Sequence, residues 1–264
     1  MDLNSIRAKF NKEQRFEAHF YGQRREVGPY TVRHFANDKA RRNFIVWSNL
    51  QDAPNIDEAI DQELDELRQT EQALEWKVYC YDFPIDLVER LQKRGLEAEE
   101  VEAIMILEFA TAPRVLTQPV RHDIRRLTHP DQLQDLLFIM REVWDSDFEW
   151  LVPRLSERME HTYEEHPIYI AYVDNEPAAT AWMTFHEGSQ FAGLWGGSTR
   201  KKFRGQGLYT SLIATRLQEA QARGGVHYFM IDASSMSRPI LEKLNFHLIG
   251  FSTPCVMQAS STSG

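Results

Sequence analysis

The second half of the chain alternates short apolar runs with amphipathic stretches, a pattern typical of a sheet covered by helices. From 208 to 222, Ile213 and Leu217 fall on one helical face, whereas Arg216 and Glu219 lie away from it. Two β-rich runs joined at 174–176 predict a hairpin. We expect helices at 130–143, 208–222 and 237–244, and strands at 168–173, 178–185, 191–199, 227–232 and 254–258.

The first half shows a similar alternation. An acidic helix is expected at 55–73, because Ile60, Leu64 and Leu67 recur at helical spacing. The other elements expected there are strands at 76–81 and 101–109 and a helix at 84–94. A connector with two prolines lies at 111–119. We therefore expect two domains, 1–118 and 119–264.

The composition narrows the class of protein. The chain has 42% hydrophobic and 26% charged residues, as soluble globular proteins do. Its net charge of -9 argues against general nucleic-acid binding, which needs a basic surface. Cys80 and Cys255 lie far apart, so neither a zinc site nor a disulfide framework is expected. There is no signal-peptide core and no apolar run of membrane-spanning length. We expect a cytoplasmic protein that binds no metal, membrane or nucleic acid.

A loop with glycines and several cations follows the strand expected at 191–199. Gly205 and Gly207 allow a tight turn and a close approach of the backbone to a ligand. The helix that follows directs its N-terminal N–H groups and the positive end of its dipole to the same place. These features suit a pyrophosphate, whereas the plain alternative is a strand–helix turn with packing glycines and solvated charges. The loop matches neither a Walker loop nor a dinucleotide fingerprint.

Two motifs make this region resemble the GNAT acetyltransferase superfamily. The family's [RQ]xxGx[GA] loop is matched by Lys202-Phe203-Arg204-Gly205-Gln206-Gly207, with lysine at the first position. Its later EKxGF pattern is matched by Leu241-Glu242-Lys243-Leu244-Asn245-Phe246, with Asn245 at the glycine position. The resemblance covers about half of the chain. It implies an α/β (mixed α+β) fold, with a mixed, partly antiparallel sheet flanked by helices.

The resemblance also implies where the co-substrate acetyl-CoA binds. In GNAT enzymes two parallel strands splay apart and the pantetheine arm bonds to the backbone of the fourth strand, here Gly197, Ser198 and Thr199. A β-bulge is an equally ordinary use of the glycine pair at 196–197. Arg200, Lys202 or Arg204 would lie near the phosphates. The pyrophosphate would meet backbone N–H groups of Gly205, Gln206, Gly207, Leu208, Tyr209 and Thr210.

The reaction implied is direct attack of an amine on the thioester, with a strand N–H stabilising the oxyanion. A base and an acid are also needed. Many GNAT enzymes use a tyrosine as the acid, but the matching position is Leu241, which leaves solvent, Tyr209 or another side chain. Asp232 and Glu149 are the candidate catalytic carboxylates. In the alternative interpretation, Asp232 caps a turn, and Glu149 and Asp147 are solvated carboxylates beside packed aromatic residues.

The first half echoes the second. Two short runs resemble each other, and each lies between two expected strands: Leu91-Gln92-Lys93-Arg94-Gly95-Leu96 and residues 241–246. The helix at 55–73 would then correspond to the helix at 208–222. We therefore expect two tandem GNAT-like domains, of which the first is degenerate. Its loop at 50–55 has no glycine and no cation, so it should not hold a pyrophosphate. An unrelated α+β domain is the alternative.

The function expected is acetyl-CoA-dependent N-acetyltransferase activity on an amine, with a small molecule as the acceptor. The alternative is a catalytically weak module that binds acyl-CoA as a sensor or scaffold, which the missing tyrosine leaves open. A nucleic-acid acetyltransferase suits the acidic chain less well. The sequence defines neither the acceptor nor the oligomeric state, and a homodimer is left open.

Overall fold

The computed structural model describes residues 2–38 and 41–259. The chain folds into two units. The N-terminal unit comprises Met1–Met105, Asp232–Ile240 and Leu248–Gly264, and the C-terminal unit comprises Ile106–Ile231 and Leu241–His247. The last strand of the chain thus belongs almost wholly to the N-terminal unit. The expected domain limits, 1–118 and 119–264, stay a prediction.

The C-terminal unit contains a mixed sheet with helices on both faces. Its strands are β6 (Glu102–Glu108), β7 (Asp123–Arg126), β8 (Ile168–Val173), β9 (Glu176–Phe185), β10 (Phe191–Thr199) and β11 (Tyr228–Ala233). Its main helices are α5 (Leu133–Trp144), α6 (Leu151–His161), α7 (Leu208–Arg223) and α8 (Arg238–Lys243), with shorter turns η2 (Phe109–Thr111), α4 (Arg114–Thr117), η3 (Pro130–Gln132) and η4 (Lys201–Phe203). The strand order is β6-β11-β10-β9-β8-β7, and β10 and β11 run parallel.

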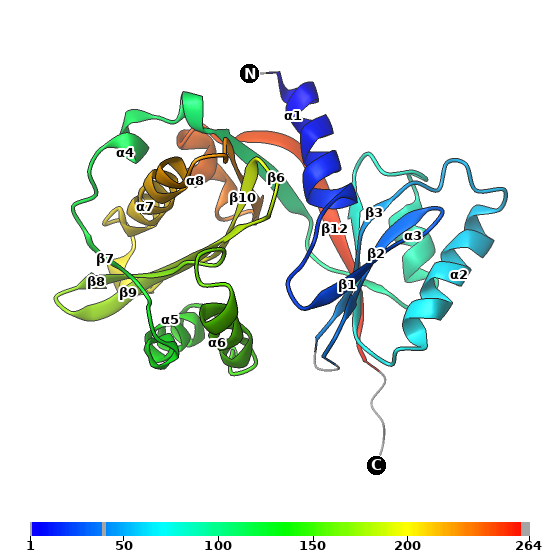
Figure 1. Ribbon diagram of the computed structural model, residues 1–264, viewed down its shortest axis with the longest axis horizontal. Helices are drawn as coiled ribbons and strands as arrows, with labels where there is room; N and C mark the ends of the chain where they lie inside the picture. Colours follow the sequence, from blue (N-terminus) through cyan, green and yellow to red (C-terminus); the bar gives the residue numbers. More distant parts are fainter. Residues whose placement is uncertain (1, 39–40, 260–264) are drawn as a thin grey trace, which may run out of the picture. The chain divides into compact units, whose positions relative to one another are not determined.

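Strand β8 shows how this sheet is covered on both faces. Ile168 and Ile170 pack into the cluster formed by α5 and α6, whereas Tyr169 and Ala171 pack against α7. Successive side chains of a strand point to opposite faces, so one apolar run fills two cores. Figure 1 shows α7 over one face of β8 and β9, with α5 and α6 over the other. Gly224 follows the last residue of α7, and its φ of 76° with ψ of 168° suits only a residue without a side chain.

The strands of the N-terminal unit are also mixed in direction. Its strands are β1 (Gln23–Val27), β2 (Thr31–Ala36), β3 (Asn43–Ser48), β4 (Leu74–Tyr79), β5 (Glu97–Ala98) and β12 (His247–Met257). Its helices are α1 (Leu3–Phe10), the π-helix η1 (Asn11–Phe16), α2 (Ile56–Arg68) and α3 (Leu87–Gln92). The order is β1-β2-β3-β4-β12, with β3 and β4 parallel and β5 beside β12. The apolar face of α2 packs on β3 and β4.

The two units repeat one arrangement, as expected from the echo between their sequences. Each has a strand, a helix, a parallel strand and a short helix, namely β3-α2-β4-α3 and β10-α7-β11-α8. Both short helices end alike: the Leu96 N–H donates to the Leu91 carbonyl at 3.2 Å, and the Phe246 N–H donates to the Leu241 carbonyl at 3.0 Å. In both units the residue just before the donor has a left-handed backbone: Gly95 at φ 89° and Asn245 at φ 65°. Asparagine tolerates this conformation, which explains its place in the motif.

The expected elements agree with the structure for β8 and β10, whose limits match, and for α7, which is longer by one residue. The acidic helix is shorter than expected, because Glu71 turns left-handed at φ 57° before β4 begins at Leu74. The final strand is much longer than expected, with 11 residues. Helices α1 and α6 and strands β1 to β3 were not predicted. Strand β2 buries Arg33 and His34, so its pattern is not that of an ordinary strand.

The described residues include no helix that combines the length and the apolar character needed to cross a bilayer.

Buried His34 predicts a loss of stability in mild acid. Burial, Arg25 and His19 lower the pKa of His34 to about 3, and neither ring nitrogen has a hydrogen-bond partner within the described ranges. The unfolded chain takes up this proton below about pH 6.5 whereas the folded chain does not, so stability is retained above that pH and lost as the pH falls toward 3. From pH 7 to pH 5 the loss from this group is about 2 kcal/mol.

Urea unfolding of the unaltered chain and of His34→Gln at both pH values measures this effect. The difference in unfolding free energy between pH 7 and pH 5 should be smaller in the variant. An equal difference in the two proteins would show that His34 is not the group that titrates.

Candidate functional site

The parallel ladder between β10 and β11 is short. Its pairs are Phe191↔Tyr228, Ala192↔Phe229 and Gly193↔Met230. Strand β10 nevertheless continues to Thr199, and over the part of the chain that the structure describes, its residues 194–199 are paired with β9 alone. The two parallel strands therefore separate after Gly193. This split is the feature that the predicted pantetheine site requires.

A β-bulge lies on the separated half of β10. Trp195 pairs with Trp182 and Ser198 with Thr180, so two residues of β10 oppose a single residue of β9 there. The two are Gly196 and Gly197. A methyl group on Gly196 would lie 1.7 Å from the ring of Trp182, and one on Gly197 would lie 2.8 Å from the ring of Tyr209. Only glycine fits at these positions. Neither residue is paired with β9, and both lie on the half of β10 that is no longer paired with β11.

The loop after β10 presents unpaired N–H groups. Gly205 and Gly207 have φ values of 79° and 81°, and α7 begins after Gly207 without a side-chain cap. Among the described residues, the backbone N–H groups of 205–210 have no protein acceptor, and the first bonded N–H is that of Ser211, to Gly207 at 2.9 Å. Unpaired N–H groups at a helix start bind anions. The geometry suits the diphosphate predicted from the sequence.

The charge of Arg200, at the start of this loop, is taken up by ion pairs. This residue is buried, and its guanidinium bonds Glu142 and Glu176 at 2.6 Å each. It also lies over the ring of Phe138. These contacts tie α5 to the start of β9. Of the three cations expected near the phosphates, Arg200 is therefore the least suited, because its charge is already compensated by two carboxylates.

Lys202 forms an ion pair with a carboxylate, whereas Arg204 does not within the described chain. The ammonium of Lys202 bonds both carboxylate oxygens of Glu176, at 2.5 and 2.7 Å. The guanidinium of Arg204 donates to the Thr199 carbonyl at 3.1 Å and has no carboxylate partner in the described chain. Arg204 is therefore better placed than Lys202 to meet a phosphate.

The side chain of Ser198 is buried and joins β10 to α5. The Trp144 indole N–H donates to the Ser198 hydroxyl at 2.9 Å, and that hydroxyl donates to the Met140 sulfur at 3.3 Å. The hydroxyl of neighbouring Thr199 is buried without a hydrogen-bond partner in the described chain. The side chain of Ser198 is thus engaged within the protein and is not available to a ligand. The indole of Trp144 is half exposed at this end of β10, a contact that the sequence did not predict.

Asp232, a candidate base, lies in a buried ion pair within the N-terminal unit. One carboxylate oxygen bonds the Lys77 ammonium, which also bonds Glu102 at 2.9 Å. The other oxygen has no partner within the described residues. Burial opposes the charge on Lys77, but Asp232, Tyr79 and Glu102 together outweigh it and raise the pKa of Lys77 well above its ordinary value. The turn-cap interpretation is wrong, because Ser234 accepts the Ser237 N–H at 3.4 Å instead.

Glu149, the second candidate, lies in the loop between α5 and α6. Its carboxylate bonds Arg141, and its N–H donates to Asp147 at 3.0 Å. Both carboxylates are exposed. The rings of Phe148 and Trp150 lie 6.4 Å apart in the same loop. The segment is thus an aromatic and acidic surface, partly neutralised by Arg141.

Leu241, at the position where many GNAT enzymes have the acid tyrosine, is fully buried. A leucine in the core has no proton to donate, so this residue is not the acid.

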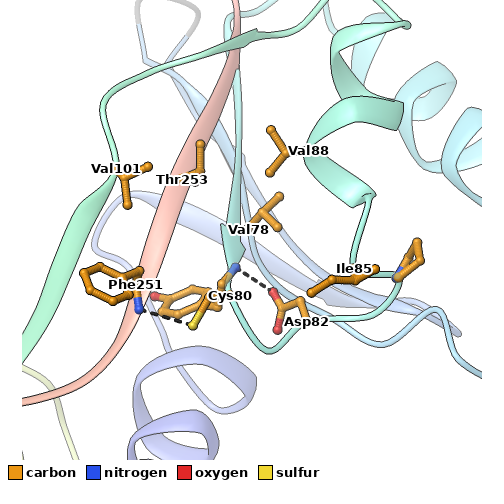
Figure 2. Close-up of a pocket in the computed structure, with 10 residues that line it drawn as sticks. Val78, Cys80, Asp82, Ile85, Val88, Val101, Phe251 and Thr253 are labelled. Carbon is orange, nitrogen blue, oxygen red and sulfur yellow. Dashed lines mark hydrogen bonds between the residues drawn. The ribbon is translucent and has the colours of Figure 1, made fainter.

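A pocket of about 300 Å³ lies elsewhere, in the N-terminal unit (Figure 2). Most of its lining residues are apolar, and its polar side chains are those of Tyr79, Cys80, Asp82 and Thr253. The Tyr79 N–H donates to Asp82 at 3.0 Å, and the Phe251 N–H donates to the Cys80 sulfur at 3.4 Å. These groups are engaged in the protein's own contacts, so we assign no acyl-transfer chemistry to this pocket.

A family model matches the part of the chain that contains the loop. The model of the acetyltransferase (GNAT) family matches residues 134–246. A comparison with curated proteins gave no match.

Solved structures share the fold over nearly the whole chain. A GCN5-related N-acetyltransferase from Kribbella flavida has a TM-score of 0.67 at 14% identity, over 96% of this chain and 93% of that one. A functionally unknown conserved protein from Staphylococcus epidermidis has a TM-score of 0.68 at 11% identity, over 92% and 97%. A tandem GNAT protein from the clavulanic acid biosynthesis pathway has a TM-score of 0.58 at 12% identity, over 94% and 86%. Residues 134–246, which carry the separated strands and the glycine loop, therefore match the model of the acetyltransferase (GNAT) family, and the whole chain shares its fold with a tandem GNAT protein.

Proposed function

We propose that this protein is an acetyl-CoA-dependent N-acetyltransferase that acetylates the amine of a small molecule. One observation carries the proposal: the β10–β11 ladder ends at Gly193 on the strand that leads to the uncapped start of α7. Diverging strands provide peptide groups for the pantetheine arm, and the helix start provides N–H groups for the diphosphate. The residues proposed to bind acetyl-CoA are Gly197, Ser198, Thr199, Lys202, Arg204, Gly205, Gln206, Gly207, Leu208, Tyr209 and Thr210.

The chemistry proposed is attack of the neutral amine on the thioester carbonyl. An N–H of the bulge in β10 is suited to stabilise the oxyanion, because the bulge lies on the half of β10 that is not paired with β11. We assign Asp232 or Glu149 to accept the amine's proton. With Leu241 buried, we assign protonation of the leaving thiolate to solvent. The exposed aromatic and acidic segment 144–150 suits a cationic acceptor, by charge and by cation–π contact.

A thiol-release assay with acetyl-CoA and a panel of small amines tests the proposal. We expect amine-dependent release of CoA and a mass increase of one acetyl group on the amine. Calorimetric titration with CoA, run in parallel, reports binding without chemistry. Failure to bind CoA would exclude the proposed function.

A sensor or scaffold that binds acyl-CoA is the second candidate. Two observations favour it: Leu241 cannot donate a proton, and Asp232 already pairs with Lys77. Saturable CoA binding without thiol release for any amine in the panel would support this alternative over the enzyme.

A further inference from the structure

The N-terminal unit repeats the split between parallel strands. The β3–β4 pairs are Asn43↔Leu74, Phe44↔Glu75 and Ile45↔Trp76. The strands then continue unpaired with each other to Ser48 and Tyr79 within the described residues. The ladder between β2 and β3 also shifts here: Trp47 pairs with Val32 and Ile45 with Arg33, which leaves Val46 as an extra residue. Both units therefore have a short parallel ladder and a bulge just beyond it.

In the N-terminal unit this split is occupied by Arg15. Its Nε donates to the Val46 carbonyl at 2.9 Å, at the bulge of β3. Its guanidinium lies 3.8 Å from the ring centroid of Tyr79, the last residue of β4. It also bonds both oxygens of Asp82, at 2.7 and 2.8 Å. One side chain, only 2% exposed, thus bridges the two strands beyond the point where their ladder ends.

The segment that carries Arg15 is anchored on both sides of this contact. Asn11 accepts a hydrogen bond from Arg15 at 3.1 Å and one from Tyr81 at 2.8 Å. The ring of Phe10 lies 6.0 Å from that of Tyr79, and the ring of Phe16 lies 5.0 Å from that of Trp47. Helices α1 and η1 therefore hold the guanidinium in place between β3 and β4.

The helix start beside this split is also closed to an anion. Asn55 caps α2 by accepting the N–H groups of Asp57 and Glu58, and those two residues add negative charge to the first turn. The start of α7 has neither a side-chain cap nor an acidic residue in its first turn. Along the described chain, no side chain bonds the backbone of residues 194–198 in β10. The two units thus differ at both parts of the site, the strands and the helix start.

We infer that the segment 3–16 is an internal ligand of the N-terminal unit, with Arg15 filling a second, vestigial acyl-CoA slot, so that the chain binds one acyl-CoA rather than two. The ligand of the vestigial slot is a guanidinium cation, recognised by the Asp82 carboxylate, the Val46 carbonyl and the face of Tyr79. The stoichiometry rests on the proposed function, whereas the guanidinium site does not depend on it.

Calorimetric titration of the full chain with CoA tests the stoichiometry. We expect one equivalent bound to the unaltered chain and none to the variant Gly205→Asp with Gly207→Asp. Two equivalents, or one equivalent retained by the variant, would overturn the inference, because the N-terminal unit would then bind CoA. No binding to the unaltered chain would instead refute the proposed function, and with it the stoichiometry.

Chemical rescue tests the guanidinium site by itself. Arg15→Ala should lower the melting temperature, and millimolar ethylguanidinium should raise it again in this variant but not in the unaltered chain. Ethylammonium has the same charge without the planar fork and should rescue less. Arg24→Ala, which removes an exposed arginine, is the control and should show no rescue. Equal responses of Arg15→Ala and the unaltered chain, or no response of Arg15→Ala, would overturn the assignment.

Discussion

Replacing Gly205 and Gly207 together by aspartate is expected to abolish CoA binding. Each carboxylate would lie beside N–H groups that are proposed to hold a diphosphate, so it would both occupy them and repel the phosphates. A repulsion on the order of 1.4 kcal/mol for each carboxylate corresponds to a loss of affinity of about 100-fold. Calorimetric titration with CoA measures this loss, and circular dichroism checks that the fold is retained.

The matched control replaces the same two glycines by asparagine. Asparagine has the shape of aspartate and tolerates the positive φ values of 79° and 81°, but it carries no charge. The asparagine variant should therefore bind CoA clearly better than the aspartate variant. Equal affinities would show that strain or bulk, rather than charge, controls the loop, and unchanged affinity in both would remove the diphosphate assignment.

The second large effect is expected for Gly196→Ala. The new methyl group would lie 1.7 Å from the Trp182 ring, and the backbone at φ 62° is unfavourable for alanine. Overpacking and a left-handed conformation together cost roughly 3 kcal/mol. The bulge of β10 should shift or the unit should lose that stability, and CoA affinity should fall because the bulge carries proposed contacts. Urea unfolding measures the first effect and calorimetry the second.

Gly188→Ala separates strain from overlap. Gly188 has a φ of 72°, and a methyl group there would meet nothing within 4 Å. It should cost only the left-handed conformation, about 1 kcal/mol. If the two alanine variants were equally stable, the contact between Gly196 and Trp182 would not constrain the bulge.

The glycine loop could be predicted from the sequence because its features are local. Gly205 and Gly207 have the left-handed backbone that glycine favours, and α7 begins where the periodic apolar residues begin. Helix starts, tight turns and alternation depend on neighbours in the chain, so a single sequence contains the information. For the same reason the limits of β8 and β10 could be predicted.

The roles of the charged residues could not be predicted in the same way. Arg200 stands in sequence next to the loop, yet it turns inward to Glu142 and Glu176. Asp232 meets Lys77, which is 155 positions away. An ion pair depends on which side chains the fold brings within a few ångströms, and spacing along the chain does not report this.

In the N-terminal half, too, one feature could be predicted from the sequence and another could not. That its loop at 50–55 should not hold a diphosphate followed from composition, and the structure adds Asn55 as the cap of α2. Arg15 in the split between β3 and β4 had no signal in the sequence, because a buried arginine and an exposed one look alike in a polar run.

By itself, the amino-acid sequence determined the order of strands and helices from β8 to the end of the chain, the glycine loop and the repeated helix ends, since these depend on the backbone preferences of adjacent residues. The tertiary structure alone decided where the parallel ladders stop, which cations stay unpaired, and which split is filled by a side chain of the protein. Those outcomes depend on packing and charge between residues distant in the chain, and no local pattern encodes them.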